Sequence, residues 1–204
     1  MPIKTGTVTT RGLATRRRII SSAAELMFAN GVADTRIEEV RASAGVSNSQ
    51  IYQHFADKTA LVRAVIDFQT DAVIEPQERL FGRLDTMDGL RTWRDRAVHQ
   101  QRGRNLRGGC PIGSLAGQLA DGDEAFRLQL AHSFERWSAG LQTGLKSMHT
   151  NGTLRPDADP EELATVLLAA LQGGLLLAKL SSDIRPLELS LDAALAHVES
   201  QLAA

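Results

Sequence analysis

The segment that most constrains this chain is TRIEEVRASAGVSNSQIYQHFADKTAL, residues 35–61. A Thr-x-x-Glu pattern that begins at Thr35 predicts the start of one helix, and Gly45 supplies the backbone freedom that ends it. A Ser-x-x-Gln pattern that begins at Ser47 predicts a second helix only two residues later. We therefore expect two short helices joined by a tight turn, with a third helix following at once.

The middle helix, from about Ser47 to His54, contains no Asp, Glu, Lys or Arg. It offers amide, hydroxyl, phenol and imidazole groups, while Ile51 at helical spacing can face a core. A short helix of this kind suits insertion into the major groove of DNA. Asp57 can cap the following helix, and Lys58 in its first turn suits a phosphate, because helix N-termini favour anions. The segment predicts sequence-specific DNA binding rather than catalysis.

The stretch GVSNSQIYQHFADKTAL, residues 45–61, resembles the recognition segment of TetR-type transcriptional regulators. In that family a Gly-Val-Ser turn leads to a helix ending in aromatic-x-His-Phe, and a Lys opens the next helix. Upstream, RIISSAAELMFANG (residues 18–31) is similar to the family's first helix and its closing Gly. The resemblance covers about residues 16–65. It implies that Tyr52, His54 and Lys58 contact DNA phosphates.

The resemblance also implies that residues between Ser47 and Gln53 touch base edges. The chain departs from the family pattern at Asn48, where Lys or Arg is common, and at Arg41, where a small residue is common. We expect Arg41 to add a phosphate or base contact from the preceding helix.

Positive charge is concentrated at the start of the chain, although the formal net charge is only −1. Residues 1–24 carry five basic residues and no acid, so the remaining residues sum to −6. A basic arm beside a helix-turn-helix can follow the DNA backbone or enter a minor groove. For residues 1–10 alone a solubilising tail is the simpler interpretation, whereas Arg16–Arg18 begin a helix and suit DNA. The predicted DNA-binding residues are Arg16, Arg17, Arg36, Arg41, Ser47, Asn48, Ser49, Gln50, Tyr52, Gln53, His54 and Lys58.

The rest of the chain also predicts helices with short breaks, and no alternating strand pattern is present. We expect an all-α fold, with an N-terminal helix-turn-helix three-helix unit followed by a C-terminal helical ligand-binding and dimerisation bundle. The expected divisions are a flexible basic arm (1–13), a helix-turn-helix DNA-binding domain (14–60) and an effector-binding and dimerisation domain (61–204). Within the last of these, the expected helices span about 58–73, 87–101, 113–120, 123–149, 160–180 and 186–201.

The stretch GCPIGSLAGQLA, residues 109–120, is similar to a Gly-Cys-x-x-Gly segment in the branch of lincomycin- and flavonoid-responsive repressors. The likeness implies a small, fairly apolar or aromatic effector. Aromatic residues flank this segment, although ordinary core packing explains any single one of them. Cys110 suits a small buried residue better than a sensor thiol, and His99 is a possible polar anchor. The predicted effector pocket consists of Trp93, Cys110, Ile112, Leu115, Gln118, Phe134, Trp137 and Leu141.

The longest apolar stretch, residues 163–180, could be misread as membrane-spanning. It contains Gln172 and a Gly pair and follows two acids, so a helix buried at a subunit interface is the better interpretation. A dimer would place two recognition helices on one palindromic operator about one helical turn apart. The predicted dimer interface consists of Leu167, Leu171, Gly174, Leu175, Leu191 and Leu195.

Enzyme motifs are lacking: the five histidines form no zinc-type pattern, and no nucleophile elbow or phosphate loop occurs. We expect no catalytic residue, metal or cofactor. One cysteine allows no intramolecular disulfide, and the N-terminus lacks a signal core, so we expect a cytoplasmic protein without membrane contact. The leading hypothesis is a repressor released from its operator by a small molecule. The alternatives are a ligand-independent regulator controlled by a protein partner and a helical-bundle enzyme.

Overall fold

The structure is a computed structural model that describes residues 10–106 and 108–203. The described residues form helices and no strand, apart from an isolated bridge between Leu154 and Leu202. The predicted all-α class is therefore confirmed. The chain divides into two compact units between Gln69 and Thr70, a position inside one continuous helix. This division lies nine residues beyond the predicted domain boundary.

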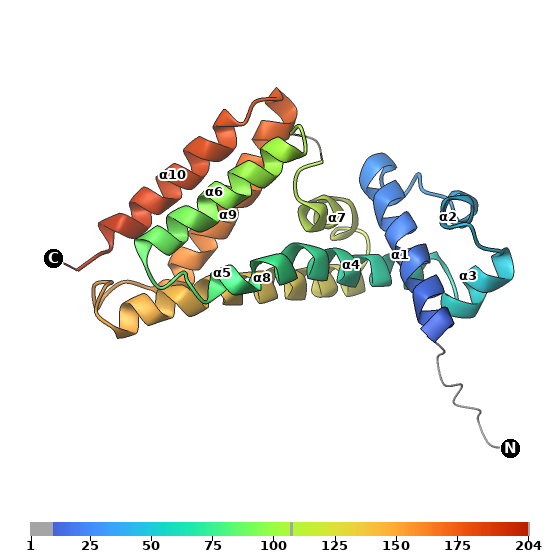
Figure 1. Cartoon of the computed structure of the whole chain (residues 1–204), viewed down its shortest axis with the longest axis horizontal. Helices are drawn as coiled ribbons and strands as arrows, with labels where there is room; N and C mark the ends of the chain where they lie inside the picture. Colours follow the sequence, from blue (N-terminus) through green and yellow to red (C-terminus); the bar gives the residue numbers. More distant parts are fainter. Residues whose placement is uncertain (1–9, 107, 204) are drawn as a thin grey trace, which may run out of the picture. The chain divides into compact units, whose positions relative to one another are not determined.

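The first unit contains α1 (Thr10–Asn30), α2 (Ile37–Ala44), α3 (Asn48–His54) and the beginning of α4 (Lys58–Ile74) (Figure 1). Helix α2 packs against both α1 and α3. The shared core is formed by Ile19, Ala23, Met27, Val40, Ile51, Phe55 and Leu61. The predicted arm at residues 1–9 lies outside the described residues, and residues 10–13 are already helical.

The start of α2 differs from the prediction by one residue. Thr35 is not the cap: it is 1% exposed, and its hydroxyl donates to the carbonyl oxygen of Gly31 at 2.7 Å. The capping position belongs to Arg36, whose backbone N–H donates to the Glu39 carboxylate at 2.9 Å. The Thr-x-x-Glu pattern was misleading because burial of the threonine competes with its use as a cap.

The turn between α2 and α3 has the predicted chemistry. Gly45 adopts φ 61°, a left-handed conformation that an L side chain rarely adopts. Ser47 then caps α3: its Oγ accepts from the backbone N–H of Gln50, while its own N–H donates to Gln50 Oε1 at 2.9 Å. The next helix is capped by Asp57, whose carboxylate accepts from Ala60 N at 2.7 Å. These local hydrogen bonds fix the direction of α3.

The second unit is a helical bundle (Figure 1). Its elements are the end of α4, the 3-10 turn η1 (Glu75–Gln77), α5 (Glu78–Phe81), α6 (Met87–Gly103), α7 (Pro111–Leu119), α8 (Glu124–Thr150), α9 (Pro160–Ser181) and α10 (Arg185–Ser200). The sequence predicted the long helices to within a few residues. It did not predict η1 or α5, because both are too short to show a hydrophobic period.

Helix α9 packs on α8 and on α10. A Cβ added at Gly174 would lie 2.2 Å from Ser190 Oγ and 2.9 Å from the Leu187 Cα, so this glycine permits α10 to approach closely. The residues predicted for a dimer interface, Leu167, Leu171, Gly174, Leu175, Leu191 and Leu195, are all buried within the protomer. An apolar helix packs one face within its own chain, so only the opposite face is available to a second subunit.

Helix α9 is also long and apolar enough to cross a membrane, judged by length and composition alone. A core helix passes the same test, and 39% of the most apolar part of α9 is buried within the bundle. The remaining face exposes Leu176, Leu177 and Leu180.

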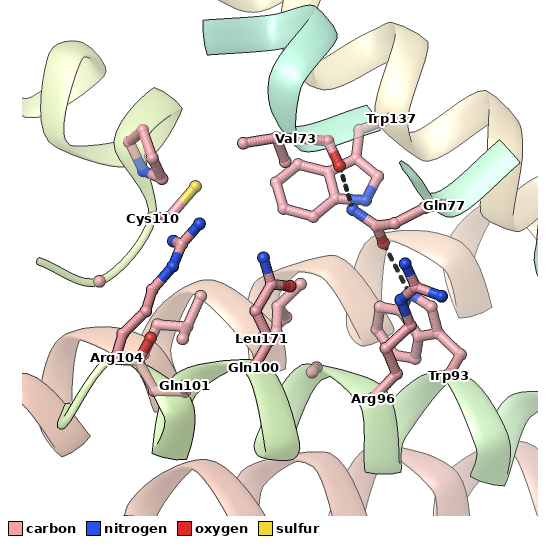
Figure 2. A pocket seen from close by; sticks show the side chains of 14 residues that line it. Val73, Gln77, Trp93, Arg96, Gln100, Gln101, Arg104, Cys110, Trp137 and Leu171 are labelled. Atoms are coloured by element: carbon pink, nitrogen blue, oxygen red, sulfur yellow. Dashed lines mark hydrogen bonds between the residues drawn. The ribbon is translucent and has the colours of Figure 1, made fainter. Parts of the chain in front are cut away.

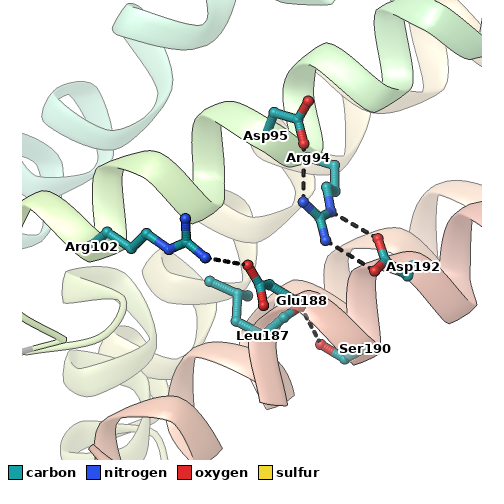
Figure 3. Close-up of polar contacts among 7 residues, drawn as sticks. All are labelled: Arg94, Asp95, Arg102, Leu187, Glu188, Ser190 and Asp192. Carbon is teal, nitrogen blue, oxygen red and sulfur yellow. Dashed lines mark hydrogen bonds and ion pairs between the residues drawn. The ribbon is translucent and has the colours of Figure 1, made fainter. Parts of the chain in front are cut away.

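Ion pairs join α6 to α10 (Figure 3). Arg94 Nε and Nη2 donate to the two carboxylate oxygens of Asp192 at 2.8 and 2.9 Å. Arg102 Nη2 lies 2.7 Å from Glu188 Oε1. Burial alone would lower the pKa of Arg94, but the hydrogen bonds to Asp192 and to Asp95 outweigh burial and raise it. These pairs hold α6 in a fixed rotation, and its opposite face is left for the bundle interior.

Candidate functional site

Helix α3 presents a polar, uncharged face to solvent. Asn48, Ser49, Tyr52 and Gln53 are all exposed, and Tyr52 is 59% exposed although its ring is large. On the other side, Ile51 is buried and holds α3 on the core. Donors and acceptors on an exposed helix face are the groups that read base edges in a major groove.

Asn48 and Gln50, both in the first turn of α3, differ in whether the side chain is used by the cap. The amide oxygen of Gln50 is already used by the cap hydrogen bond to Ser47 N. A bidentate contact with adenine needs both the oxygen and the nitrogen of a glutamine side chain, so Gln50 would have to give up its cap to make one. The Asn48 side chain forms no cap hydrogen bond within the described residues, which makes it the stronger candidate for bidentate base contact.

Two cationic side chains of the first unit are held in place by contacts within that unit. The Arg16 guanidinium lies 5.2 Å from the centre of the Phe55 ring, and Arg18 Nε donates to the carbonyl oxygen of Ala44 at 2.8 Å. Three more of the predicted arginines, Arg17, Arg36 and Arg41, form no ion pair within the described residues. Stacking orients Arg16 and leaves its charge available for an anion.

The predicted phosphate-contacting residues after the middle of α3 are also placed by local contacts. His54 is half-buried beside Phe55, with ring centres 6.4 Å apart. Lys58, at the first position of α4, donates from Nζ to the carbonyl oxygen of Ala33 at 3.1 Å. An ammonium group has three donors, so this bond still leaves Lys58 able to meet a phosphate.

A cavity of about 60 Å³ lies inside the bundle (Figure 2). Its walls come from the end of α4, from η1, α6, α8 and α9, and from the start of α7. It is lined by Val73, Gln77, Trp93, Arg96, Ala97, Gln100, Gln101, Arg104, Gly109, Cys110, Pro111, Trp137, Leu171 and Leu175.

The indole N–H groups of the two tryptophans in this cavity differ in whether they have a hydrogen-bond acceptor. The indole N–H of Trp93 donates to Gln77 Oε1 at 3.0 Å, and Gln77 Nε2 donates onward to the Val73 carbonyl oxygen at 2.7 Å (Figure 2). The indole N–H of Trp137 has no hydrogen-bond partner within the described part of the chain, although this residue is only 3% exposed. Unsatisfied buried donors are rare in proteins and call for a physical reason.

Cys110 caps α7 and lies on the cavity wall. Its Sγ accepts from the backbone N–H of Gly113 at 3.4 Å. Burial raises the pKa of the Cys110 thiol above its ordinary value of 9.0, and the Gly113 hydrogen bond opposes this only in part. The thiol is therefore neutral at physiological pH and a weak nucleophile.

The predicted pocket residues are divided among three environments. Trp93, Cys110 and Trp137 line the cavity. Phe134 stacks on Trp137 with ring centres 6.4 Å apart, but it lines a neighbouring, more open cavity of about 530 Å³ that also includes Cys110. The others line neither cavity: Ile112, Leu115 and Leu141 are buried core residues, and Gln118 and His99 are exposed.

The sequence interpretation missed most of the polar lining. Arg96 and Gln100 on α6 and Arg104 directly after its end follow Trp93 along the cavity, spaced four residues apart. That spacing was visible in the sequence as a polar stripe leading into the Gly-rich break. Leu171 and Leu175, predicted for a dimer interface, also line the cavity.

Metal ligands form no cluster here. Among residues 10–106 and 108–203, no group of three or more His, Cys, Asp or Glu side chains could hold a metal ion.

Known proteins match both units. The family described as "Bacterial regulatory proteins, tetR family" matches residues 19–65, and "Tetracyclin repressor-like, C-terminal domain" matches residues 86–194. The HTH-type transcriptional repressor DhaR of Mycobacterium sp. (strain GP1) is 24% identical over 189 residues, which cover 85% of this chain and 86% of DhaR. The HTH-type transcriptional regulator SrpR of Pseudomonas putida is 36% identical over 70 residues, covering 30% of this chain and 33% of SrpR.

Solved structures agree with the sequence matches. A TetR transcriptional regulator from Chloroflexus aurantiacus J-10-FL superimposes with a TM-score of 0.80 at 25% identity, covering 95% of this chain and 98% of that one. The resemblance to the lincomycin- and flavonoid-responsive branch stays a prediction. The match of residues 19–65 includes α2, α3 and the capped turn between them, so the helix-turn-helix is the one found in DNA-binding regulators of this kind. The chain belongs to the TetR family of helix-turn-helix transcriptional regulators.

Proposed function

We propose that this protein is a homodimeric repressor that leaves a palindromic operator when a small, fairly apolar or aromatic molecule enters the bundle cavity. The chain acts by binding DNA and effector, in the cytoplasm, without catalysis and without membrane contact. Family membership supports the regulatory role, and the uncharged exposed face of α3 supports base reading. The observation that carries effector binding is the cavity itself, with a buried indole N–H of Trp137 that lacks an acceptor among the described residues.

The outward face of α9 supports the homodimer. Leu176, Leu177 and Leu180 lie at helical spacing on one face, and Gly173 beside them is exposed with open space around it. Exposed apolar residues that share a face mark interaction surfaces. A second copy of this chain suits this face better than lipid does, because the opposite face of α9 is packed on α8 and α10.

Release of DNA follows from linkage between two sites. An effector that binds better when the two α3 helices are wrongly spaced for the operator weakens DNA binding by the same factor. Helix α4 is continuous from Lys58, next to the α3 turn, to Val73 on the cavity wall. We assign it the role of the lever between effector and DNA.

The proposed function is tested by selecting genome fragments with the purified protein at physiological salt and sequencing them. A recovered palindrome with half-sites about one helical turn apart supports a dimer that reads DNA through α3. Recovery of no enriched sequence would overturn the proposal.

The dimer is tested separately by sedimentation. Leu176→Glu with Leu180→Glu is expected to give monomers that lose operator affinity, because two charges would be buried in the interface. Leu128→Glu is the matched control, since Leu128 is 54% exposed and belongs to α8 rather than to α9. Dimers that persist in the α9 variant would place the interface elsewhere.

A further inference from the structure

The polar lining of the bundle cavity is almost entirely composed of hydrogen-bond donors or amides. Arg96 and Arg104 carry positive charge, and Gln77, Gln100 and Gln101 carry amides. Among the described residues, no Asp or Glu lines the cavity. A site with two cations and no acid attracts an anion.

Arginines on α6 fall into two groups that differ in their partners. Arg94 pairs with Asp192 at 2.8 Å and Arg102 with Glu188 at 2.7 Å (Figure 3). Arg91 likewise pairs with Glu199 on α10 at 2.9 Å. On the cavity side, Arg96 and Arg104 form no ion pair within the described residues. The second group therefore has no partner acid in the described bundle, and both of its side chains are exposed to solvent at the cavity.

Two buried donors at the same cavity also lack acceptors. Trp137 Nε1 and Gln101 Nε2 have no hydrogen-bond partner within the described residues, and both side chains are only 3% exposed. Leaving such a donor unpaired is unfavourable, and an incoming acceptor removes that cost. Carboxylate oxygens accept several hydrogen bonds and pair with the planar arginine fork.

The apolar lining of the cavity limits the size of the uncharged part of a bound ligand. Trp93, Trp137, Leu171 and Leu175 form walls for a hydrocarbon body. The cavity volume of about 60 Å³ suits only a compact hydrocarbon body. The neighbouring cavity of about 530 Å³ shares Gly109, Cys110 and Leu175, so a shift of this shared wall would admit a larger body.

We infer that the cavity recognises a small organic carboxylate, with its charge attracted by Arg96 in the middle of α6 and Arg104 directly after its end, and its body between the two tryptophans. This inference rests on the proposed role of the cavity as the effector site, and it names the chemical class of that effector. Figure 2 shows the Arg104 and Gln100 side chains on the same side of the cavity, with Cys110 facing Arg104.

Matched acid and amide pairs test the charge requirement. We would titrate the full-length protein with butanoate, benzoate and phenylacetate, and with butanamide, benzamide and phenylacetamide. Intrinsic fluorescence reports binding directly, because the chain has two tryptophans and both line the cavity. At least one carboxylate is expected to bind about tenfold or more tightly than its amide, since hydrogen bonds to charged groups are the stronger ones.

Two pairs of arginine variants supply the site test and its control. The double variant Arg96→Gln and Arg104→Gln is expected to remove the preference for the carboxylate and leave the amide unaffected. Arg91→Gln with Arg102→Gln changes two arginines of the same helix that pair with α10 instead, and is expected to keep the preference. Thermal melts of both double variants check that each remains folded.

Operator release, measured in parallel by fluorescence anisotropy, separates this inference from the proposed function. A carboxylate that changes the tryptophan fluorescence but does not release DNA would support the inference and contradict effector release. Equal binding of acids and amides, a preference that survives loss of Arg96 and Arg104, or no response to any carboxylate at about 10 mM would overturn the inference. Release of DNA by the amides alone would support the proposed function and overturn the inference that the effector is a carboxylate.

Discussion

The two units of this protein use arginine in opposite ways. Around α3, Arg17, Arg36 and Arg41 form no ion pair within the described residues. In the bundle, arginines of α6 pair with acids on α10, apart from those that line the cavity. In both units, arginines without an ion pair within the described residues lie at a proposed binding site, for DNA phosphate in one unit and for an organic carboxylate in the other.

The largest expected effect comes from removing the unpaired charges of the first unit. Arg17→Gln, Arg36→Gln and Arg41→Gln in one variant should weaken binding to all DNA sequences. The slope of log affinity against log salt should also fall by about one unit for each phosphate that the variant no longer neutralises. A salt titration by fluorescence anisotropy measures both quantities. An unchanged slope would show that these arginines do not meet phosphates.

The second prediction separates base reading from helix capping within α3. Asn48→Ala should relax preference at one operator position by about 1–3 kcal/mol if Asn48 contacts a base there. Gln50→Ala should instead cost about 1 kcal/mol of stability, because it removes the acceptor of the cap hydrogen bond from Ser47 N. An operator-wide substitution scan and urea unfolding distinguish the two effects. Identical profiles for both variants would contradict the distinction.

Helix α3 could be predicted because its determinants are contiguous. The cap at Ser47, the turn at Gly45 and the buried Ile51 lie within seven residues, and each acts on its nearest neighbours. The same reasoning misplaced the start of α2, because nothing local shows that Thr35 is buried. Capping chemistry is local, whereas burial is decided by residues far along the chain.

The cavity could be predicted only in part, because its walls come from elements that are distant in sequence. Trp93, Cys110 and Trp137 were identified by size and by the Gly-rich break. Gln77 was not, since its role depends on the hydrogen bond from Trp93 across the cavity. The face of α9 was also undetermined: a helix apolar on nearly every side does not reveal which leucines its own bundle covers.

The third prediction concerns the paired arginines of the bundle. A double-mutant cycle of Arg94→Gln and Asp192→Asn should give a coupling free energy of about 1 kcal/mol, because the pair is bidentate but partly exposed. The Arg102 and Glu188 pair, with its more exposed arginine, should give less. Urea unfolding measures both cycles. Coupling near zero for the Arg94 pair would mean that the ion pairs do not hold α6 against α10.

The smallest expected effect is a pH dependence at Cys110. Burial raises the pKa of this thiol in the folded protein above 9.0, its ordinary value. Well below pH 9 the folded and unfolded chains both keep the proton, so the pH dependence of stability has no contribution from this group. As pH rises further, the unfolded chain loses its proton first, and stability should fall. Unfolding free energies at pH 8 and pH 10 should therefore differ more in the wild type than in Cys110→Ala.

The most direct test of the account is amide hydrogen exchange with and without the operator recovered by fragment selection. We expect the strongest DNA-induced protection in residues 47–58, which include α3 and the start of α4, because these backbone amides lie beside the predicted base and phosphate contacts. The bundle cavity on α6 should show less protection. Strongest protection in the bundle, with residues 47–58 unaffected, would contradict the assignment of α3 as the DNA-reading helix.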